Sequence, residues 1–257
     1  MHSVNRITKT DRPHVTFSVS RLTAWAPGLE TPEDWRAWAR GERAVGRDGE
    51  PPLKQVSPLL RRHAGQLGRM VCEVAFQALD AEVDVPIVYC SRHGETKRSV
   101  EMLQDLAHHA VVSPTSFSLS VHNSAAGILS IARHDRANHV ALAAGEESAA
   151  HGVIEACGLL ADGAARVLLI VADSPIPDVY SAWADVEPAA FAWAAVLEPA
   201  GASPVTLEWE DAIAPTGTGL RMSAALEVLR FLQGNATEFT HQVEAHRWRW
   251  SRSDRGD

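Results

Sequence analysis

The chain has 257 residues, of which 46% are hydrophobic and 22% are charged, a composition typical of a folded globular protein. Its formal net charge of −8 argues against a general nucleic-acid-binding protein, because such a protein presents a basic surface. The sequence has no run of eighteen apolar residues and no charged-then-apolar leader, so we expect neither a membrane span nor a signal peptide. Three scattered cysteines are too few for a disulfide framework, which indicates a reducing, cytoplasmic location.

The chain is expected to form a flexible polar arm, residues 1–13, followed by a single domain, residues 14–257. The domain opens with a strand at 14–22, and Thr31 then caps a helix that has proline at its first position. The basic and aromatic tail at 246–250 is interpreted as an edge strand with its tryptophans inward, rather than as a nucleic-acid or membrane contact. Between them we expect helices at 58–80, 97–108, 123–133, 148–160 and 220–233, and strands at 85–90, 139–144, 164–172, 189–198 and 204–209.

Residues 113–174 are the most informative part of the sequence. Their last strand, 164–172, is almost wholly apolar, which is typical of a strand in a parallel sheet that is covered by helices on both faces. The turn at 144–148 joins a strand to a helix. Such turns often carry reactive groups in α/β proteins, because a helix N-terminus offers free N–H donors and the positive end of a dipole.

The same segment carries an ordered set of marker residues. Ser113 and Pro114 are followed by a phenylalanine, then by Asn123 with small residues and Gly127, and then by a strand, a sharp turn, a helix, Gly163 and an apolar strand. This order resembles the N-terminal half of β-ketoacyl synthases, and the resemblance extends more loosely over residues 15–198. It implies an α/β, thiolase-like fold with a mixed, mostly parallel sheet covered by helices on both faces.

The family pattern can be laid over this chain without gaps, with Asn123 and Gly163 on the corresponding family residues. The nucleophilic cysteine of the family then falls on Glu146, so the thiol is absent. The two histidines that bind and decarboxylate the malonyl group lie in a C-terminal half that is not expected here. We therefore expect no catalytic residues, no cofactor and no enzymatic activity of the chain alone.

A synthase homologue without its nucleophile resembles a chain length factor, the inactive partner of an active ketosynthase in fatty-acid, polyketide or aryl-polyene biosynthesis. The resemblance implies a heterodimer or larger assembly, which meets an acyl carrier protein through the complex and shapes the acyl tunnel. By position in the pattern, the tunnel wall involves His93, Thr115, Ser116, Phe117 and Asn123. Because Thr115 and Ser116 are small, a rather long pocket is expected.

Glu146 has two interpretations. Chain length factors often carry glutamine at this position, and an amide or carboxylate there has been linked to decarboxylation of malonyl units. The simpler interpretation is that Glu146 and Glu147 are acidic first-turn residues, each of which stabilises the following helix by a few tenths of a kcal/mol.

Two other function classes stay open. The segment Arg92-His93-Gly94 follows a strand and resembles the signature of histidine phosphatases, with Arg98 as a further phosphate ligand and His151 as the second histidine. However, that family places its motif on the first strand of the domain. The chain is alternatively a stand-alone module that binds acyl groups or acyl carrier protein, which co-purification with a synthase would distinguish from a chain length factor.

The remaining candidates are weaker. Cys90 and Cys157 are interpreted as core residues rather than nucleophiles. The histidines do not show the spacing of metal ligands, so no metal is expected. Arg61, Arg62 and Arg69 could meet an acidic carrier protein, although a solvated helix face is the favoured interpretation.

Overall fold

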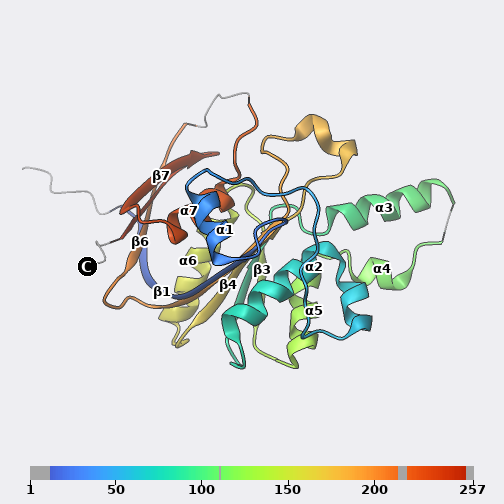
Figure 1. Cartoon of the computed structure of the whole chain (residues 1–257), viewed down its shortest axis with the longest axis horizontal. Coiled ribbons are helices and arrows are strands. Elements are labelled where there is room, and N and C mark those ends of the chain that lie inside the picture. Colours follow the sequence, from blue (N-terminus) through green and yellow to red (C-terminus); the bar gives the residue numbers. More distant parts are fainter. Residues whose placement is uncertain (1–11, 110, 214–218, 253–257) are drawn as a thin grey trace, which may run out of the picture.

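The computed structural model describes residues 12–109, 111–213 and 219–252 (Figure 1). The expected arm at 1–13 therefore lies almost wholly outside the described residues. The helices are α1 (Pro32–Ala39), α2 (Pro58–Leu79), α3 (Thr96–Ala107), α4 (Pro114–Ser118), α5 (Ser124–Arg133), α6 (Ser148–Ala161), the 3₁₀ helix η1 (Asp178–Trp183) and α7 (Ala224–Gln233). The strands are β1 (His14–Trp25), β2 (Ile87–Cys90), β3 (His139–Leu142), β4 (Val167–Asp173), β5 (Phe191–Pro199), β6 (Val205–Asp211), β7 (Glu238–Val243) and β8 (His246–Arg252).

These strands form one sheet in the order β3-β2-β4-β5-β1-β6-β8-β7. The sheet is mixed, as expected, but it is not mostly parallel. Only β2 makes parallel pairs, with β3 and β4, and the other pairings of the sheet are antiparallel. The short turn between β7 and β8 can only produce antiparallel neighbours, and β5 runs back beside β4 after a connection whose helix is the short η1.

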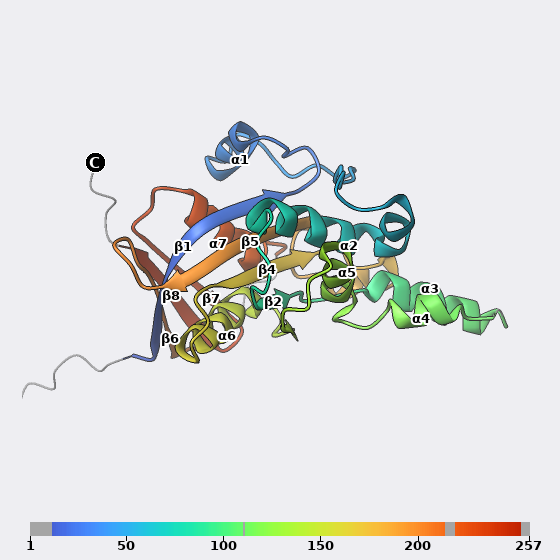
Figure 2. The same cartoon turned by 90° about the horizontal axis from the view of Figure 1, so that it is seen from below.

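Alternation along the strands divides the core between the two faces of the sheet. In β5, Phe191 and Trp193 belong to the cluster with α1, α6 and α7, whereas Ala192 and Ala194 belong to the cluster with α2 and α5. Figure 2 shows α2 and α6 on opposite sides of the strands. Helices on both faces, predicted from the apolar run at 164–172, are therefore confirmed.

The C-terminal strands and α7 belong to the same core cluster as α6. Trp248 and Trp250 are fully buried in one cluster with Val153 and Ala156 of α6 and with the apolar face of α7. The inward tryptophans were predicted correctly, but β8 is not an edge strand, because β7 pairs along its other side. This packing completes the core around α6 within the described part of the chain.

Most expected elements are present, with three differences. The helix expected at 220–233 begins at Ala224, because Ser223 caps it and accepts a hydrogen bond from the backbone N–H of Leu226. The short elements α4, η1 and β7 were not predicted. The long helix expected at 58–80 is present but contains non-helical backbone at Gly65, whose φ of 62° lies in the left-handed region.

The α3 and α4 helices extend away from the sheet and have no buried residue (Figure 1). Their larger apolar side chains face solvent, including Leu103 and Phe117, which are 59% and 65% exposed. Strand β3 forms one edge of the sheet, and none of its residues is fully buried. This end of the molecule therefore presents apolar side chains and an unpaired strand edge together.

Candidate functional site

The corner between β3 and α6 is built by residues 144–148. Gly145 adopts a φ of 58°, and a side chain there would collide with the carboxylate of Glu244. The Ser148 hydroxyl donates to the Gly145 carbonyl at 2.7 Å and accepts from the Ala144 N–H at 3.0 Å, which closes the turn. The turn directs Glu146 to the strand-to-helix corner, where the sequence pattern placed it.

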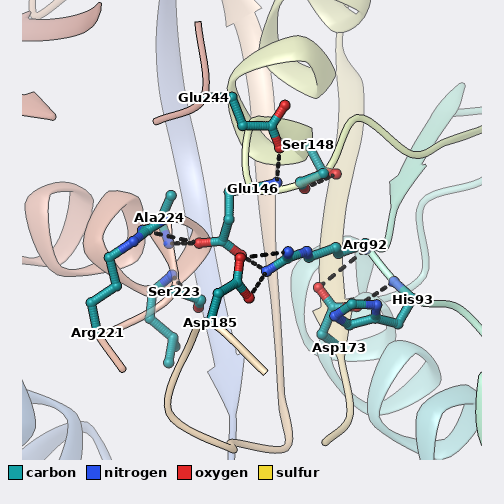
Figure 3. Close-up of polar contacts among 12 residues, drawn as sticks. Arg92, His93, Glu146, Ser148, Asp173, Asp185, Arg221, Ser223, Ala224 and Glu244 are labelled. Atoms are coloured by element: carbon teal, nitrogen blue, oxygen red, sulfur yellow. Dashed lines mark hydrogen bonds and ion pairs between the residues drawn. The ribbon is translucent and has the colours of Figure 1, made fainter. Parts of the chain in front are cut away.

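The carboxylate of Glu146 is buried and both of its oxygens are occupied (Figure 3). Oε1 accepts from Nη1 of Arg92 at 2.8 Å, and Oε2 accepts from Nη1 of Arg221 at 3.2 Å and from the backbone N–H of Ala224 at 2.9 Å. Ala224 is the first residue of α7, so the carboxylate lies at the positive end of that helix. Three donors hold one carboxylate, which leaves no oxygen directed at an open space.

Arg92 also forms a second, two-pronged contact. Its Nη1 and Nη2 donate to Oδ1 and Oδ2 of Asp185 at 2.9 and 2.8 Å, the fork geometry that makes such pairs strong. Hydrogen bonding by Arg92 lowers the pKa of Asp185 below its ordinary value. Arg92 thus joins the turn after β2, the corner before α6 and the loop before β5.

Asp173, at the end of β4, positions this arginine through its backbone. Its carboxylate accepts from the Ser91 hydroxyl at 2.8 Å and from the backbone N–H groups of Arg92 and His93 at 3.2 and 3.1 Å. Burial raises the pKa of Asp173 to about 6, although these hydrogen bonds oppose the rise. The Ser91 hydroxyl in turn accepts from the N–H of Gly94 at 2.8 Å, so the whole turn is fixed from β4.

Glu147 is buried as well, and it points to the C-terminal strands. Its Oε1 accepts from Nδ1 of His246 at 2.8 Å and from Nε1 of Trp248 at 3.2 Å, and His151 lies 3.5 Å from Oε2. The interpretation of Glu146 and Glu147 as ordinary first-turn acids is therefore wrong. Glu146 binds groups from distant segments, and Glu147 binds the C-terminal strand β8 in addition to lying beside His151 of α6.

The expected tunnel residues lie on three separate segments. His93 is half-buried in the turn after β2, and burial together with the Arg92 charge lowers its pKa. Thr115, Ser116 and Phe117 lie on the projecting α4, with Thr115 and Phe117 exposed. Asn123 precedes α5 and lines a shallow depression of about 470 Å³ beside β3. Their role as a tunnel wall remains a prediction.

The arrangement that a histidine phosphatase needs is not formed. Arg92 is held by two carboxylates, and the side chain of Arg98 lies beside Glu95 at 3.5 Å. His151 is inside α6, where its ring packs edge-on against Trp248 at 5.3 Å, and the described residues include no contact between it and His93. The short motif therefore resembles the phosphatase signature in sequence but not in geometry.

The cysteines lack the environment of a nucleophile. Burial raises the pKa of Cys72 to about 12 and that of Cys157 to about 11, and it also raises the pKa of Cys90.

Among residues 12–109, 111–213 and 219–252, no group of three or more histidines, cysteines or acids could hold a metal ion. In the same described part of the chain, no helix has the length and apolar character needed to cross a membrane.

The arginines proposed for a carrier protein are only partly available. Arg69 forms an ion pair with Glu50, and its Nε donates to the Arg61 carbonyl at 2.9 Å. Arg62 is exposed on α2. The Arg69 side chain and the Arg61 carbonyl are thus engaged with each other within α2.

Several residues of the site were not identified from the sequence. Asp173, Asp185 and Arg221 lie far along the chain from Glu146, and no local pattern links them to it. One usable indication was the position of Asp173 directly at the end of a buried strand, where α/β folds often place functional side chains.

Comparisons with known proteins agree with this fold. One chain of the ketosynthase ApeO in complex with its chain length factor ApeC from Xenorhabdus doucetiae is similar, with 28% identity, a TM-score of 0.78, and 92% of this chain and 99% of that chain covered. The ishigamide ketosynthase/chain length factor is similar in fold, with 19% identity, a TM-score of 0.61, and coverage of 77% and 68%. A ketosynthase from module 6 of the bacillaene synthase of Bacillus subtilis 168 shares the fold at 10% identity, with a TM-score of 0.57 and coverage of 79% and 42%.

No curated protein sequence matches the chain. The family model described as β-ketoacyl synthase, N-terminal domain, matches residues 35–251, which is most of the sequence. The thiolase-like fold predicted from the marker residues is confirmed by this match and by the similar structures. The chain therefore belongs to the β-ketoacyl synthase family, as a member of its N-terminal domain group.

Proposed function

We propose that this chain is a chain-length-factor-like subunit that pairs with an active ketosynthase and does not catalyse condensation itself. The observation that carries the proposal is the Glu146 carboxylate, which has three donors on its two oxygens at the strand-to-helix corner to which the resemblance assigns the family's nucleophile. The similarity to a ketosynthase in complex with its chain length factor supports a partner of the same kind.

The chemistry of the corner supports an accessory role. Claisen condensation needs a thiolate that accepts the acyl chain, and the raised pKa values of all the described cysteines keep their thiols protonated. A carboxylate held by Arg92, Arg221 and a helix N-terminus is a poor nucleophile, because its lone pairs are engaged. The corner therefore stabilises the fold of a subunit whose role is to form part of the tunnel wall.

The finer parts of the proposal concern the product. The complex would work in a fatty-acid, polyketide or aryl-polyene system in the cytoplasm and would receive its acyl chain from an acyl carrier protein. His93, Thr115, Ser116, Phe117 and Asn123 would contribute to the wall that limits chain growth. The small side chains of Thr115 and Ser116 favour a long pocket.

The end of the molecule formed by β3, α3 and α4, called here the partner face, is the proposed contact with the ketosynthase. Its strand edge is unpaired, and its apolar side chains Val140, Leu103, Leu106 and Phe117 are exposed. Such a combination is typical of a surface that another chain covers. The acyl-tunnel residues on α4 would then meet the partner directly.

Co-expression with an active ketosynthase tests this proposal. We expect the two chains to co-elute in size-exclusion chromatography, and Leu103→Asp or Phe117→Asp to weaken the pair at least tenfold, because each buries a charge in the interface. Val83→Asp is the matched control, since Val83 is 58% exposed, close to the 59% of Leu103, but lies between α2 and β2.

Two outcomes would argue against the partner face. If Val83→Asp weakens the pair as much as Leu103→Asp, the effect is not specific to that surface. If the chain elutes alone and binds acyl carrier protein by itself, the stand-alone binding module is the better description.

The histidine-phosphatase alternative would require phosphate release that Arg92→Gln abolishes. Because the Arg92 guanidinium is already bound to Asp185, we expect no such activity.

A further inference from the structure

A second cavity lies at the opposite end of the sheet from the partner face. It has a volume of about 730 Å³, within the range of about 300–1,000 Å³ that is usual for small-molecule sites. The α1 and α7 helices and strand β7 form its walls, so it shares no element with the corner at Glu146 except α7. Nothing in the proposed function assigns a role to this cavity.

The floor of the cavity is apolar and aromatic. Phe231, Phe239 and Ala39 line it. Phe231 is only 3% exposed, because Phe239 stacks on it with centroids 6.1 Å apart and the Arg252 guanidinium lies 4.2 Å from its ring, so Phe239 offers the more accessible ring. An aromatic or similarly flat apolar group could lie against this floor, since offset stacking is favourable at such distances.

The charges around the cavity are unequally satisfied. Glu238 accepts from Nε of Arg249 at 2.8 Å, and Glu227 lies 3.4 Å from Nδ1 of His241. Arg36 and Arg40 on the rim form ion pairs with acids of their own segment. Each acid among the described lining residues therefore has a basic side chain within 3.4 Å.

Arg230 differs from these groups. Its guanidinium lies 5.0 Å from the ring centroid of Trp38, and the described residues offer it no ion pair and no hydrogen bond. Its Nε is buried without a partner, and so is the Oε1 of Gln233 on the same helix. Nη1 and Nη2 of Arg230 are not among the buried atoms, so these two nitrogens are the donors that the guanidinium can offer to a ligand in the cavity.

From these contacts we infer that the cavity between α1, α7 and β7 binds a small organic carboxylate with an aromatic or apolar body. The carboxylate pairs with Arg230, as guanidinium groups favour planar oxyanions, and the body lies on Phe231 and Phe239. This inference does not depend on the proposed function, because it needs neither a ketosynthase partner nor the corner at Glu146.

The probe pair 4-phenylbutyrate and 4-phenylbutan-1-ol tests the inference, because the two differ in the carboxylate but share the apolar body. Each is titrated into the full-length chain, and binding is followed by calorimetry and by the NMR signal of the Trp38 indole. We expect the acid to bind at least tenfold more tightly than the alcohol and to shift the Trp38 signal. Equal affinities, or shifts that spare Trp38, would overturn the inference.

Variants of Arg230 and Ala39 test separately whether binding depends on the positive charge and on the open space of the cavity. Arg230→Met should weaken 4-phenylbutyrate at least tenfold and leave the alcohol nearly unchanged, and Arg230→Lys should retain most of the binding because it keeps the positive charge. Ala39→Phe should exclude both probes by filling the floor. Arg136→Met is the matched control, since Arg136 is an exposed arginine between α5 and β3, and it should bind both probes like the natural chain. Unchanged binding in Arg230→Met would rule out the site.

Discussion

At the scale of single residues, the site is a set of charges that hold one another. Glu146 is paired with Arg92 and Arg221, and Arg92 is paired in turn with Asp185. Removing one member of a buried pair is more costly than the net value of the pair, because the other charge is left without its partner. We therefore expect Glu146 to contribute to the stability of the fold.

Glu146→Gln tests this stabilising role. The amide can accept hydrogen bonds at only one atom and presents its own N–H groups to the remaining donors, so we expect the free energy of unfolding to fall by about 2–4 kcal/mol. Glu244→Gln is the matched control. Glu244 is exposed and accepts from the Glu146 N–H at 3.3 Å, and its loss should cost less than about 1 kcal/mol in urea unfolding. Equal effects of the two variants would contradict the role assigned to Glu146.

Asp173 predicts a pH dependence. Its pKa is raised from 3.8 to about 6 in the folded chain, so between these pH values the folded state binds more protons than the unfolded state. Stability from this group is then fully present below about pH 4 and is lost as the pH rises towards 6, by about 1–3 kcal/mol. Asp173→Asn removes the titration. The difference in unfolding free energy between the natural chain and this variant should shift by that amount between pH 4 and 6, and a pH-independent difference would refute the assignment.

At the scale of elements, α4 is where sequence differences should alter the product. Its residues Thr115, Ser116 and Phe117 lie on the projecting segment that the proposal places in the tunnel wall. Replacing the partly buried Ser116 by phenylalanine should shorten the products of a co-purified complex by several carbons, because a larger side chain occupies the space of the growing chain. Ser118→Phe on the exposed side of α4 is the control. Unchanged product length in Ser116→Phe would remove α4 from the wall.

The elements that could be predicted are those whose residues specify them locally. Thr31 forms a complete capping box with Asp34 at the start of α1, and the continuous apolar run of β4 is buried on both faces. Strand β7 was missed because its sequence is largely polar and its pairing partner β8, rather than its composition, makes it a strand. The expectation of a mostly parallel sheet failed for a related reason, since strand direction follows from connections that composition does not reveal.

The candidate site was predictable only in part. The corner at 144–148 could be located, because a glycine and a serine sit where a strand becomes a helix. The partners of its carboxylate could not, since Arg221 and Ala224 are 75 and 78 residues away along the chain. Contacts over such separations depend on how α7 packs against α6, and no local residue pattern encodes that packing.

At the scale of the whole molecule, the core, the partner face and the Arg230 cavity lie in different parts of the structure. The central strands and their helices form the family core, and the β6-β8-β7 extension with α7 covers α6 through Trp248 and Trp250. The partner face lies at the β3 end, and the Arg230 cavity lies at the other end. The corner at Glu146 joins α6 to α7, so it connects the core to the part that covers it.

The most direct measurement is a condensation assay of the chain with its ketosynthase, in two matched complexes. In one, the nucleophilic cysteine of the ketosynthase is replaced by alanine, and in the other, this chain carries Glu146→Gln. Because this chain is proposed to contribute shape without turnover, the first complex should form no elongated product, whereas the second should keep its rate per folded complex within about twofold. Elongation by the first complex, or by this chain alone, would contradict the account.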